Sequence, residues 1–263
     1  MEQRQRPDYT VLDQPEVTRY LFHPRREDSH RRLTAKDLMI PVDDTTVVGA
    51  CFHLTTKTGP SILFFHGNGE IVSDYDDLGG VYNRMGINFI VVDFRGYGRS
   101  NGSPSVSTLM ADCHPILDRV THHLDDLGFK GPLTVMGRSL GSAPALELAA
   151  STPGPIASLI IESGFARAEP LLSTLGIDPK AIGFKEEQGF CNIDKIGRWT
   201  GPTLIIHAEF DHIIPFSDGE ALYNACGADK KRLLKIANAN HNDIFFQDMN
   251  TYMAAVSTLV ENE

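Results

Sequence analysis

One short stretch, residues 133–144 (LTVMGRSLGSAP), constrains the fold of this chain more than any other. An apolar run of strand character stops at Gly137 and is followed by Ser139 and then Gly141. This is a G-x-S-x-G pattern between a predicted strand and a predicted helix, the arrangement of a nucleophile elbow. The serine of such an elbow lies on a tight, strained turn. Side chains two residues away on either side would collide there, so both positions need glycine.

The same pattern occurs a second time, at residues 98–102, with Ser100 in the middle. Ser100 follows a glycine-broken loop and soon meets a proline, which opposes the start of a helix. Ser139 follows a strand and precedes a good helix-forming run, residues 140–150. Pro144 falls in the first turn of that run, where proline is tolerated. The context therefore favours Ser139 as the nucleophile and leaves Ser100 as its rival.

Apolar runs of strand character alternate along the chain with stretches of helical character. The predicted buried strands are residues 61–65, 89–93, 133–136, 158–162, 203–207 and 232–236, and the predicted helices are residues 72–84, 106–127, 140–150, 219–225 and 243–260. Continuous apolar strands are typical of a sheet covered on both faces, and the alternation implies right-handed β-α-β crossovers. We therefore predict an α/β fold with a doubly wound, mostly parallel central sheet and helices on both faces.

The chain before this pattern is less regular. Residues 17–24 are predicted to form a first strand and residues 25–32 a charged surface loop. Residues 36–41 and 47–54 are predicted to form two antiparallel strands.

Residues 164–200 break the alternation. The segment is longer than the usual connection and is rich in leucine, isoleucine and phenylalanine, which favours helices of its own. It leaves the strand that ends at Glu162, at the sheet edge where open α/β sheets bind ligands. We predict a small helical cap over that edge, with a packing excursion at the end of the sheet as the alternative. Residues 1–263 as a whole are predicted to be one domain.

The composition limits the functions to consider. The chain has 24 Lys and Arg against 34 Asp and Glu, a net charge of -10, which argues against nucleic-acid binding. The first residues lack the apolar run of a signal peptide, and no apolar run approaches the length of a membrane span. Cys51, Cys113, Cys191 and Cys226 have neither metal-site nor redox-motif spacing. We therefore expect reduced thiols, no bound metal, no membrane span and a cytoplasmic location.

A serine nucleophile needs a base to take its proton and an acid to orient that base. In an open α/β sheet all three should lie at carboxyl ends of strands. Asp211 comes four residues after the strand that ends at His207, so its carboxylate can reach inward from the loop. Glu162 is the rival acid, with a supporting role toward loop backbone as its other interpretation. Glu209 is a third candidate, which we expect to face solvent.

Ten histidines are candidates for the base, and the pattern favours His241. It lies in the loop between the last strand and the last helix, so the chain order is Ser139, Asp211, His241, the nucleophile-acid-base order of elbow-type hydrolases. His212 adjoins Asp211 in sequence and cannot easily receive its orienting hydrogen bond. An imidazole with an ordinary pKa of about 6.5 can accept the serine proton near neutral pH and return it to a leaving group.

The first buried strand ends in the sequence H-G-N-G, residues 66–69. Gly67 allows the backbone to come close to a substrate. The oxyanion hole beside this type of elbow takes one N–H from the residue after the nucleophile and one from such a loop. We therefore predict the backbone N–H groups of Leu140 and Asn68 as the donors. His66 is expected to brace the loop and not to act in catalysis.

Together these motifs resemble the α/β-hydrolase superfamily, and most of all its compact serine hydrolases with short caps. The segments that carry the resemblance are H-G-N-G, D-F-R-G-Y-G-R-S, G-R-S-L-G, H-A-E-F-D-H-I-I-P and N-H-N. They extend from the first buried strand to the end of the chain, and H-A replaces the commoner H-G before the acid loop. The resemblance implies a Ser139–His241–Asp211 triad, an oxyanion hole formed by Asn68 and Leu140, and no metal or organic cofactor.

We therefore expect a serine hydrolase that cleaves a carboxylic ester or thioester through an acyl-enzyme on Ser139. An amidase or peptidase on the same triad is the first alternative. A non-catalytic ligand-binding protein on the same fold is the second, and the presence of all three triad residue types argues against it. The apolar residues of segment 164–200 favour a small-molecule acyl substrate with an apolar acyl or alcohol part.

Overall fold

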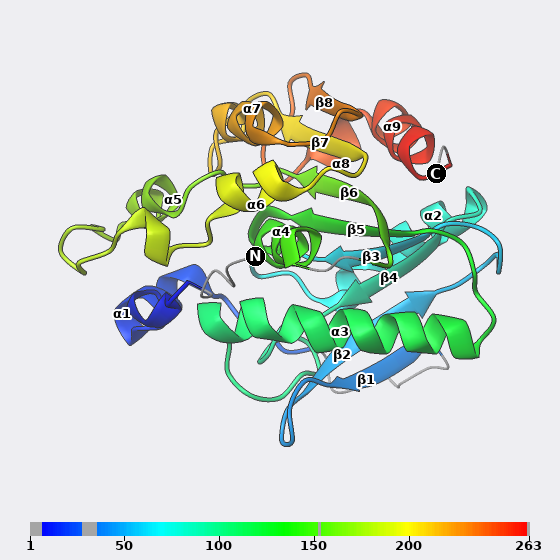
Figure 1. Ribbon diagram of the computed structural model, residues 1–263, viewed down its shortest axis with the longest axis horizontal. Coiled ribbons are helices and arrows are strands. Elements are labelled where there is room, and N and C mark those ends of the chain that lie inside the picture. Colours follow the sequence, from blue (N-terminus) through cyan, green and yellow to red (C-terminus); the bar gives the residue numbers. More distant parts are fainter. Residues whose placement is uncertain (1–6, 28–35, 152–153, 262–263) are drawn as a thin grey trace.

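A computed structural model describes residues 7–27, 36–151 and 154–261, which build one sheet with helices on both of its faces (Figure 1). The strands are β1 (Asp37–Pro41), β2 (Val47–His53), β3 (Ser61–Phe65), β4 (Asn88–Val92), β5 (Leu133–Arg138), β6 (Ile156–Glu162), β7 (Thr203–Ala208) and β8 (Lys231–Ile236). The helices are α1 (Pro15–Leu21), α2 (Asp76–Arg84), α3 (Val106–Asp126), α4 (Ser142–Ser151), α5 (Ala168–Thr174), α6 (Asn192–Arg198), α7 (Phe216–Ala225), α8 (Ile244–Gln247) and α9 (Met249–Glu261).

The strands follow the spatial order β1-β2-β4-β3-β5-β6-β7-β8. Strand β2 pairs antiparallel with both of its neighbours, and every pairing from β4 to β8 is parallel. The predicted doubly wound, mostly parallel sheet is therefore confirmed. Each of the strands predicted after residue 36 is present, with bounds that differ by a few residues at most.

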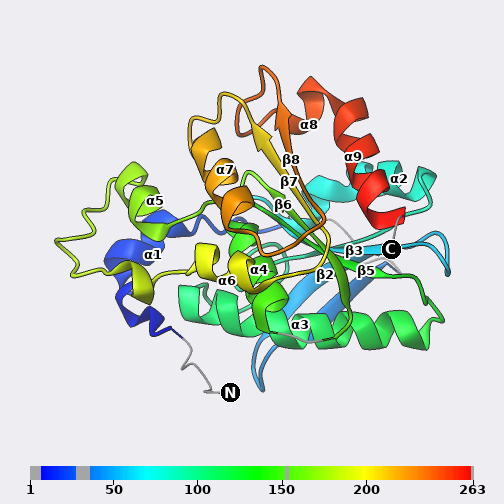
Figure 2. The ribbon, with the colours of Figure 1, turned by 45° about the horizontal axis from the view of Figure 1, so that its top comes forward.

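Side chains of the central strands alternate between two apolar layers. In β3, Leu63 and Phe65 belong to the layer that contains residues of α3, α4, α6 and α7. Ile62 and Phe64 belong to the layer that contains residues of α2 and α9. Figure 2 shows α2 and α9 on the opposite side of the sheet from α3 and α4. Because both faces are covered, the strands are apolar at successive positions.

The N-terminal prediction of a strand at residues 17–24 is wrong. Helix α1 begins with Pro15 at its first position, where proline is well tolerated. Its buried residues, Val17 and Leu21, are four positions apart and share one helical face. The β-branched and aromatic residues of this stretch suggested a strand, and burial of that single face overrides their propensity. Of the predicted loop, residues 28–32 lie outside the described part of the chain.

The segment predicted as a cap contains α5 and α6. Helix α6 packs against α4 and α7 and so belongs to the helical layer of the sheet. Helix α5 lies apart from the sheet, at the same end of the molecule as α1, in both views (Figures 1 and 2). A cap over the sheet edge stays a prediction. Within the described residues, no helix combines the length and the apolar character that a bilayer span requires.

A buried ion pair joins α4 to α6. Glu147 Oε2 lies 2.7 Å from Lys195 Nζ, and the two side chains are 8% and 2% exposed. Burial raises the pKa of Glu147, but the opposite effect of His114 and Lys195 is larger. The pKa therefore falls from 4.5 to about 2. The ionised carboxylate therefore stabilises the fold above pH 4.5, and this contribution is lost as the pH falls through the folded-state pKa near 2.

Replacing Glu147 by glutamine should lower the free energy of unfolding at neutral pH by about 3–5 kcal/mol, because Lys195 would stay buried without a counter-charge. The deficit should shrink as the pH falls from 4.5 toward 2, because wild-type Glu147 is then protonated. Urea unfolding across this pH range measures both effects. Glu169→Gln, at an exposed position of α5, is the matched control. A deficit that does not change with pH would contradict the ion pair as its cause.

Candidate active site

Ser139 lies on the turn between β5 and α4, and its φ of 51° falls in the left-handed region that side chains rarely adopt. A Cβ atom at Gly137 would lie 2.2 Å from the carbonyl oxygen of Gly141. A Cβ atom at Gly141 would lie 2.1 Å from the carbonyl oxygen of Phe65. The turn therefore requires glycine at both positions, and strain is concentrated at the serine between them.

The sheet brings the three predicted triad residues to one edge. Ser139 follows β5, Asp211 follows β7, and His241 follows β8. These strands belong to the consecutive parallel run β5-β6-β7-β8, so their carboxyl ends lie side by side.

His241 bridges the other two side chains. Its Nε2 lies 3.0 Å from Ser139 Oγ, and its Nδ1 lies 2.7 Å from Asp211 Oδ2. All three residues are buried, with exposed fractions of 8% for Ser139, 8% for Asp211 and 4% for His241. This is the geometry of a nucleophile, a base and an orienting acid.

The environment of Asp211 keeps its carboxylate ionised. Burial raises its pKa, but the hydrogen bond with His241 and those from the backbone N–H groups of Ile213 and Ile214 bring the pKa below its ordinary value. The two backbone bonds, to Oδ1, measure 3.0 and 2.8 Å. An ionised Oδ2 accepts a hydrogen bond from the Nδ1–H of His241, which leaves Nε2 as the acceptor for the Ser139 hydroxyl.

Arg138, directly before Ser139, connects the loops around the site. Its Nη2 donates to the carbonyl oxygen of His241 at 3.0 Å. Its Nε lies 3.2 Å from Glu70 Oε1 and 3.6 Å from Glu162 Oε1. Burial alone lowers the pKa of Arg138, but these two carboxylates raise it above its ordinary value, so the guanidinium stays charged.

The sequence reasoning missed Arg138 and Glu70 as parts of the site. A signal was present, because an arginine at the end of a buried strand requires carboxylate partners, and Glu162 ends the neighbouring strand. Glu70 also accepts from the backbone N–H of Gly67 at 2.6 Å and from the Tyr75 hydroxyl at 2.5 Å. Glu70 therefore links Arg138 to the loop after β3.

The rival nucleophile and acids have other contacts. Ser100 is fully buried, and its Oγ accepts from the backbone N–H of Gly49 at 3.0 Å. Glu162 accepts from the Tyr252 hydroxyl at 2.5 Å and lies 3.6 Å from Arg138 Nε, so these contacts are to side chains and not to the loop backbone of its alternative role. Glu209 accepts from Lys235 Nζ and from a backbone N–H, both at 3.0 Å.

Two further histidines are buried near the site. His66 Nδ1 donates to the carbonyl oxygen of Gly67 at 2.8 Å, and its Nε2 lies 3.3 Å from Asp93. His207 Nε2 donates to the carbonyl oxygen of Ile214 at 2.8 Å, and burial lowers its pKa. Both imidazoles hold loops.

A cavity of about 330 Å³ opens above Ser139. It is lined by Leu21, His23, Gly67, Asn68, Glu70, Ser139, Leu140, Phe165, Leu171, Leu175, Ile213, Ile214, His241 and Asn242. The Asn68 side chain is held, because its Oδ1 accepts from the backbone N–H of His23 and from the Tyr97 hydroxyl. Leu140 lies in the first turn after Ser139, where N–H groups have no partner within the helix. Asn68 and Leu140 therefore line the same cavity as Ser139.

The local packing also requires glycine at position 67, apart from any approach of a ligand. A Cβ atom there would lie 2.8 Å from Glu70 Oε2. The residue thus leaves room for the carboxylate that accepts its own N–H.

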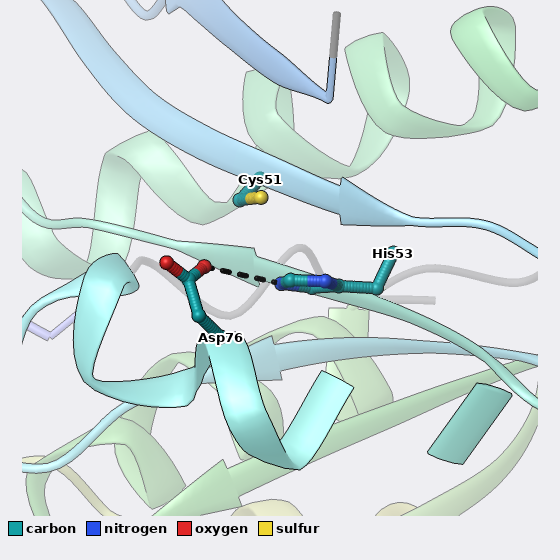
Figure 3. Close-up of side chains that lie close together, drawn as sticks. All are labelled: Cys51, His53 and Asp76. Carbon is teal, nitrogen blue, oxygen red and sulfur yellow. Dashed lines mark ion pairs between the residues drawn. The ribbon is translucent and has the colours of Figure 1, made fainter. Parts of the chain in front are cut away.

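A separate cluster of side chains of types that can ligate metal ions lies on β2 and α2 (Figure 3). The donor atoms of Cys51, His53 and Asp76 lie within 4.8 Å of one another, and the His53 ring edge faces the Asp76 carboxylate at 3.7 Å. The His53 ring also packs on Gly79, where a Cβ atom would lie 2.3 Å from it. Strands β4 and β3 separate β2 from β5, so this cluster is not part of the Ser139 site.

Comparison with known proteins agrees with this fold. A family model described as serine aminopeptidase, S33, matches residues 56–181. The chain is 31% identical over 254 residues to α/β hydrolase domain-containing protein 17B of Xenopus tropicalis, with 90% of this chain and 82% of the relative covered. The chain belongs to the α/β-hydrolase superfamily, as the motifs predict, and it is a hydrolase. Within the superfamily it is similar to α/β hydrolase domain-containing proteins 17B and 17C.

Solved structures show the same fold at low identity. An esterase of Pyrococcus furiosus matches with a TM-score of 0.72 and 15% identity, covering 91% of this chain and 98% of the esterase. A soluble variant of monoglyceride lipase from Saccharomyces cerevisiae matches with a TM-score of 0.68 and 16% identity, covering 88% and 96%.

Replacing Gly137 by alanine should destabilise the fold by about 1–3 kcal/mol or more, because the added methyl group meets backbone at 2.2 Å. Gly80→Ala is the control, since its Cβ would meet only a flexible arginine tip at 3.7 Å. Gly80 lies inside α2, so alanine there should stabilise by about 0.5–1 kcal/mol. Urea unfolding of both variants checks this, and equal effects would contradict the packing argument.

Proposed function

We propose that this hydrolase is a serine hydrolase that cleaves carboxylic esters or thioesters through an acyl-enzyme on Ser139. The observation that carries the proposal is the continuous hydrogen-bonded chain from Ser139 Oγ through His241 to Asp211, at 3.0 and 2.7 Å. A serine in a left-handed elbow whose proton has a base within hydrogen-bond distance is arranged for nucleophilic attack.

In the proposed reaction, Ser139 Oγ attacks the acyl carbon while His241 Nε2 takes the hydroxyl proton. The negative charge on the former carbonyl oxygen is stabilised by the backbone N–H groups of Asn68 and Leu140. His241 then gives the proton to the leaving alkoxide or thiolate. A water molecule, deprotonated by His241, attacks the acyl-enzyme, and the acid is released as His241 returns the proton to Ser139 Oγ. Asp211 stays ionised and stabilises the imidazolium form of His241 in both halves.

The lining of the Ser139 cavity supports an apolar acyl part. Phe165, Leu171 and Leu175 line one part of it, and Ile213 and Ile214 line another. The first three come from the segment predicted as a cap, which we propose to cover the acyl chain. The esterase and lipase among the structural neighbours are consistent with such substrates.

The amidase or peptidase alternative keeps one point of support, the description of the matching family model as a serine aminopeptidase. The same triad would attack an amide, and the leaving group decides between the two activities. An aminoacyl p-nitroanilide assayed beside a p-nitrophenyl ester discriminates them directly.

A fluorophosphonate probe should label the wild-type protein and not Ser139→Ala, because the probe forms a bond with an activated serine. Ser100→Ala should label like wild type, since Ser100 Oγ is buried against the Gly49 backbone. His241→Ala should label at a rate lower by about 100-fold or more. Gel fluorescence over time measures all four. Labelling that survives in Ser139→Ala would exclude Ser139 as the nucleophile.

Ester hydrolysis should become more efficient as the acyl chain grows from acetate to octanoate, because each methylene buried in the cavity contributes up to about 0.8 kcal/mol. Leu175→Trp narrows the cavity and should reduce kcat/KM for octanoate by about tenfold more than for acetate. Leu127→Trp, at an exposed position after α3, is the control. Equal losses for both esters would contradict acyl binding along Leu175.

A further inference from the structure

A second and larger cavity, of about 480 Å³, has Arg138 but not Ser139 in its lining. It is lined by Phe64, Glu70, Asp74, Tyr75, Asp77, Leu78, Val81, Tyr82, Phe89, Met136, Arg138, Glu162, Asn242, Ile244, Phe245, Phe246, Met249 and Tyr252. Of these residues only Glu70 and Asn242 also line the Ser139 cavity. The volume falls within the range of about 300–1,000 Å³ that is typical of small-molecule sites.

The cavity has an apolar body and an outer mouth of its own. Its walls come from β3, β4 and β5, from α2, and from the region of α8 and α9. Phe246 and Met249 belong to its lining and are 80% and 38% exposed, so they mark where the cavity meets solvent. A large aromatic side chain left in water beside an apolar cavity is a feature of ligand and partner sites more than of a closed core.

The inner end of the cavity is polar. Arg138 lines it, and Nη1 of Arg138 is buried without a hydrogen-bond acceptor among the described residues. The neighbouring carboxylates are already engaged, Glu70 by Tyr75 and the Gly67 backbone and Glu162 by Tyr252. A buried guanidinium donor without an acceptor is costly, and an oxygen atom of a bound molecule would remove that cost.

The charges of the cavity lining determine whether the ligand oxygen that accepts from Arg138 should be anionic or neutral. Glu70, Glu162, Asp74 and Asp77 line the cavity with Arg138 as the single cation of the lining. Asp74 also pairs with Arg25 outside it, and burial raises the pKa of Glu162, so Glu70 and Asp77 supply the remaining negative charge. An anionic ligand would therefore meet an excess of negative charge, whereas a neutral carbonyl or hydroxyl oxygen can accept from Arg138 without that repulsion.

We propose that this cavity is a second binding site, which takes a neutral aromatic or aliphatic molecule whose carbonyl or hydroxyl oxygen accepts a hydrogen bond from Arg138. The site goes beyond the proposed ester hydrolysis, because it has its own mouth and does not include Ser139. Binding there does not depend on catalysis and can be measured in an inactive protein.

Prodan, a neutral naphthyl ketone whose fluorescence reports its surroundings, is a suitable probe. It should bind to Ser139→Ala protein with a blue shift. Leu78→Trp and Val81→Trp, which fill the cavity from α2, should each raise Kd by about tenfold or more. Leu175→Trp, which fills the Ser139 cavity, is the matched control and should leave Kd unchanged. The anionic naphthyl dye 1,8-ANS should bind at least about tenfold more weakly than prodan.

Two variants, Leu78→Trp and Val81→Trp, fill the cavity independently, so the test still works if one of them does not fold. Circular dichroism checks that each variant is folded. Absence of prodan binding to the unfilled protein would overturn the proposal. So would prodan binding that is lost in Leu175→Trp and retained in both filling variants, since the probe would then occupy the Ser139 cavity. Equal affinity for 1,8-ANS would overturn the assignment of a neutral ligand.

A ligand on Arg138 also touches the group that holds the catalytic loop, because Nη2 of Arg138 donates to the His241 carbonyl. This step rests on the proposed function. In active protein, saturating prodan should change kcat for ester hydrolysis, and Leu78→Trp should abolish the change. An unchanged kcat with prodan bound would refute the coupling and leave the binding site standing. Absence of ester hydrolysis would refute the proposed function and leave the binding result intact.

Discussion

The buried guanidinium of Arg138 holds the loops of the site in place relative to Ser139. A single buried cation would be strongly destabilising, and the charges of Glu70 and Glu162 offset that cost. Glu70 belongs to the loop after β3, Glu162 ends β6, and the His241 carbonyl belongs to the loop after β8. One side chain next to Ser139 thereby contacts the loop after β3, the end of β6 and the loop after β8.

The positions of Ser139, Asp211 and His241 could be predicted because each follows from a local or topological rule. The elbow leaves no space for a Cβ atom at Gly137 or Gly141, and the sequence pattern shows this directly as two glycines. The acid and the base follow from the rule that parallel strands present their carboxyl ends at one edge. The structure brings all three side chains within hydrogen-bond distance. Their catalytic roles remain the proposal that labelling tests.

Other parts of the molecule depend on contacts between segments that are distant in sequence. The pairing of Arg138 with Glu70 requires knowledge of how the loop after β3 folds back. Helix α1 forms because Val17 and Leu21 are buried by residues that come much later in the chain, and its local composition favours a strand. The larger cavity exists because of the spacing between α2 and the α8–α9 region, which no local pattern encodes.

The two cavities share Glu70, which connects groups on both sides. Glu70 lines both, and its two oxygens serve different groups: Oε1 faces Arg138, whereas Oε2 accepts from the Gly67 backbone and from Tyr75. A change in the hydrogen bonding of Arg138 must alter its interaction with Glu70, because both are held in a buried, low-dielectric region. Since Glu70 positions the loop that carries Asn68, the larger cavity is connected to the proposed oxyanion hole as well as to His241.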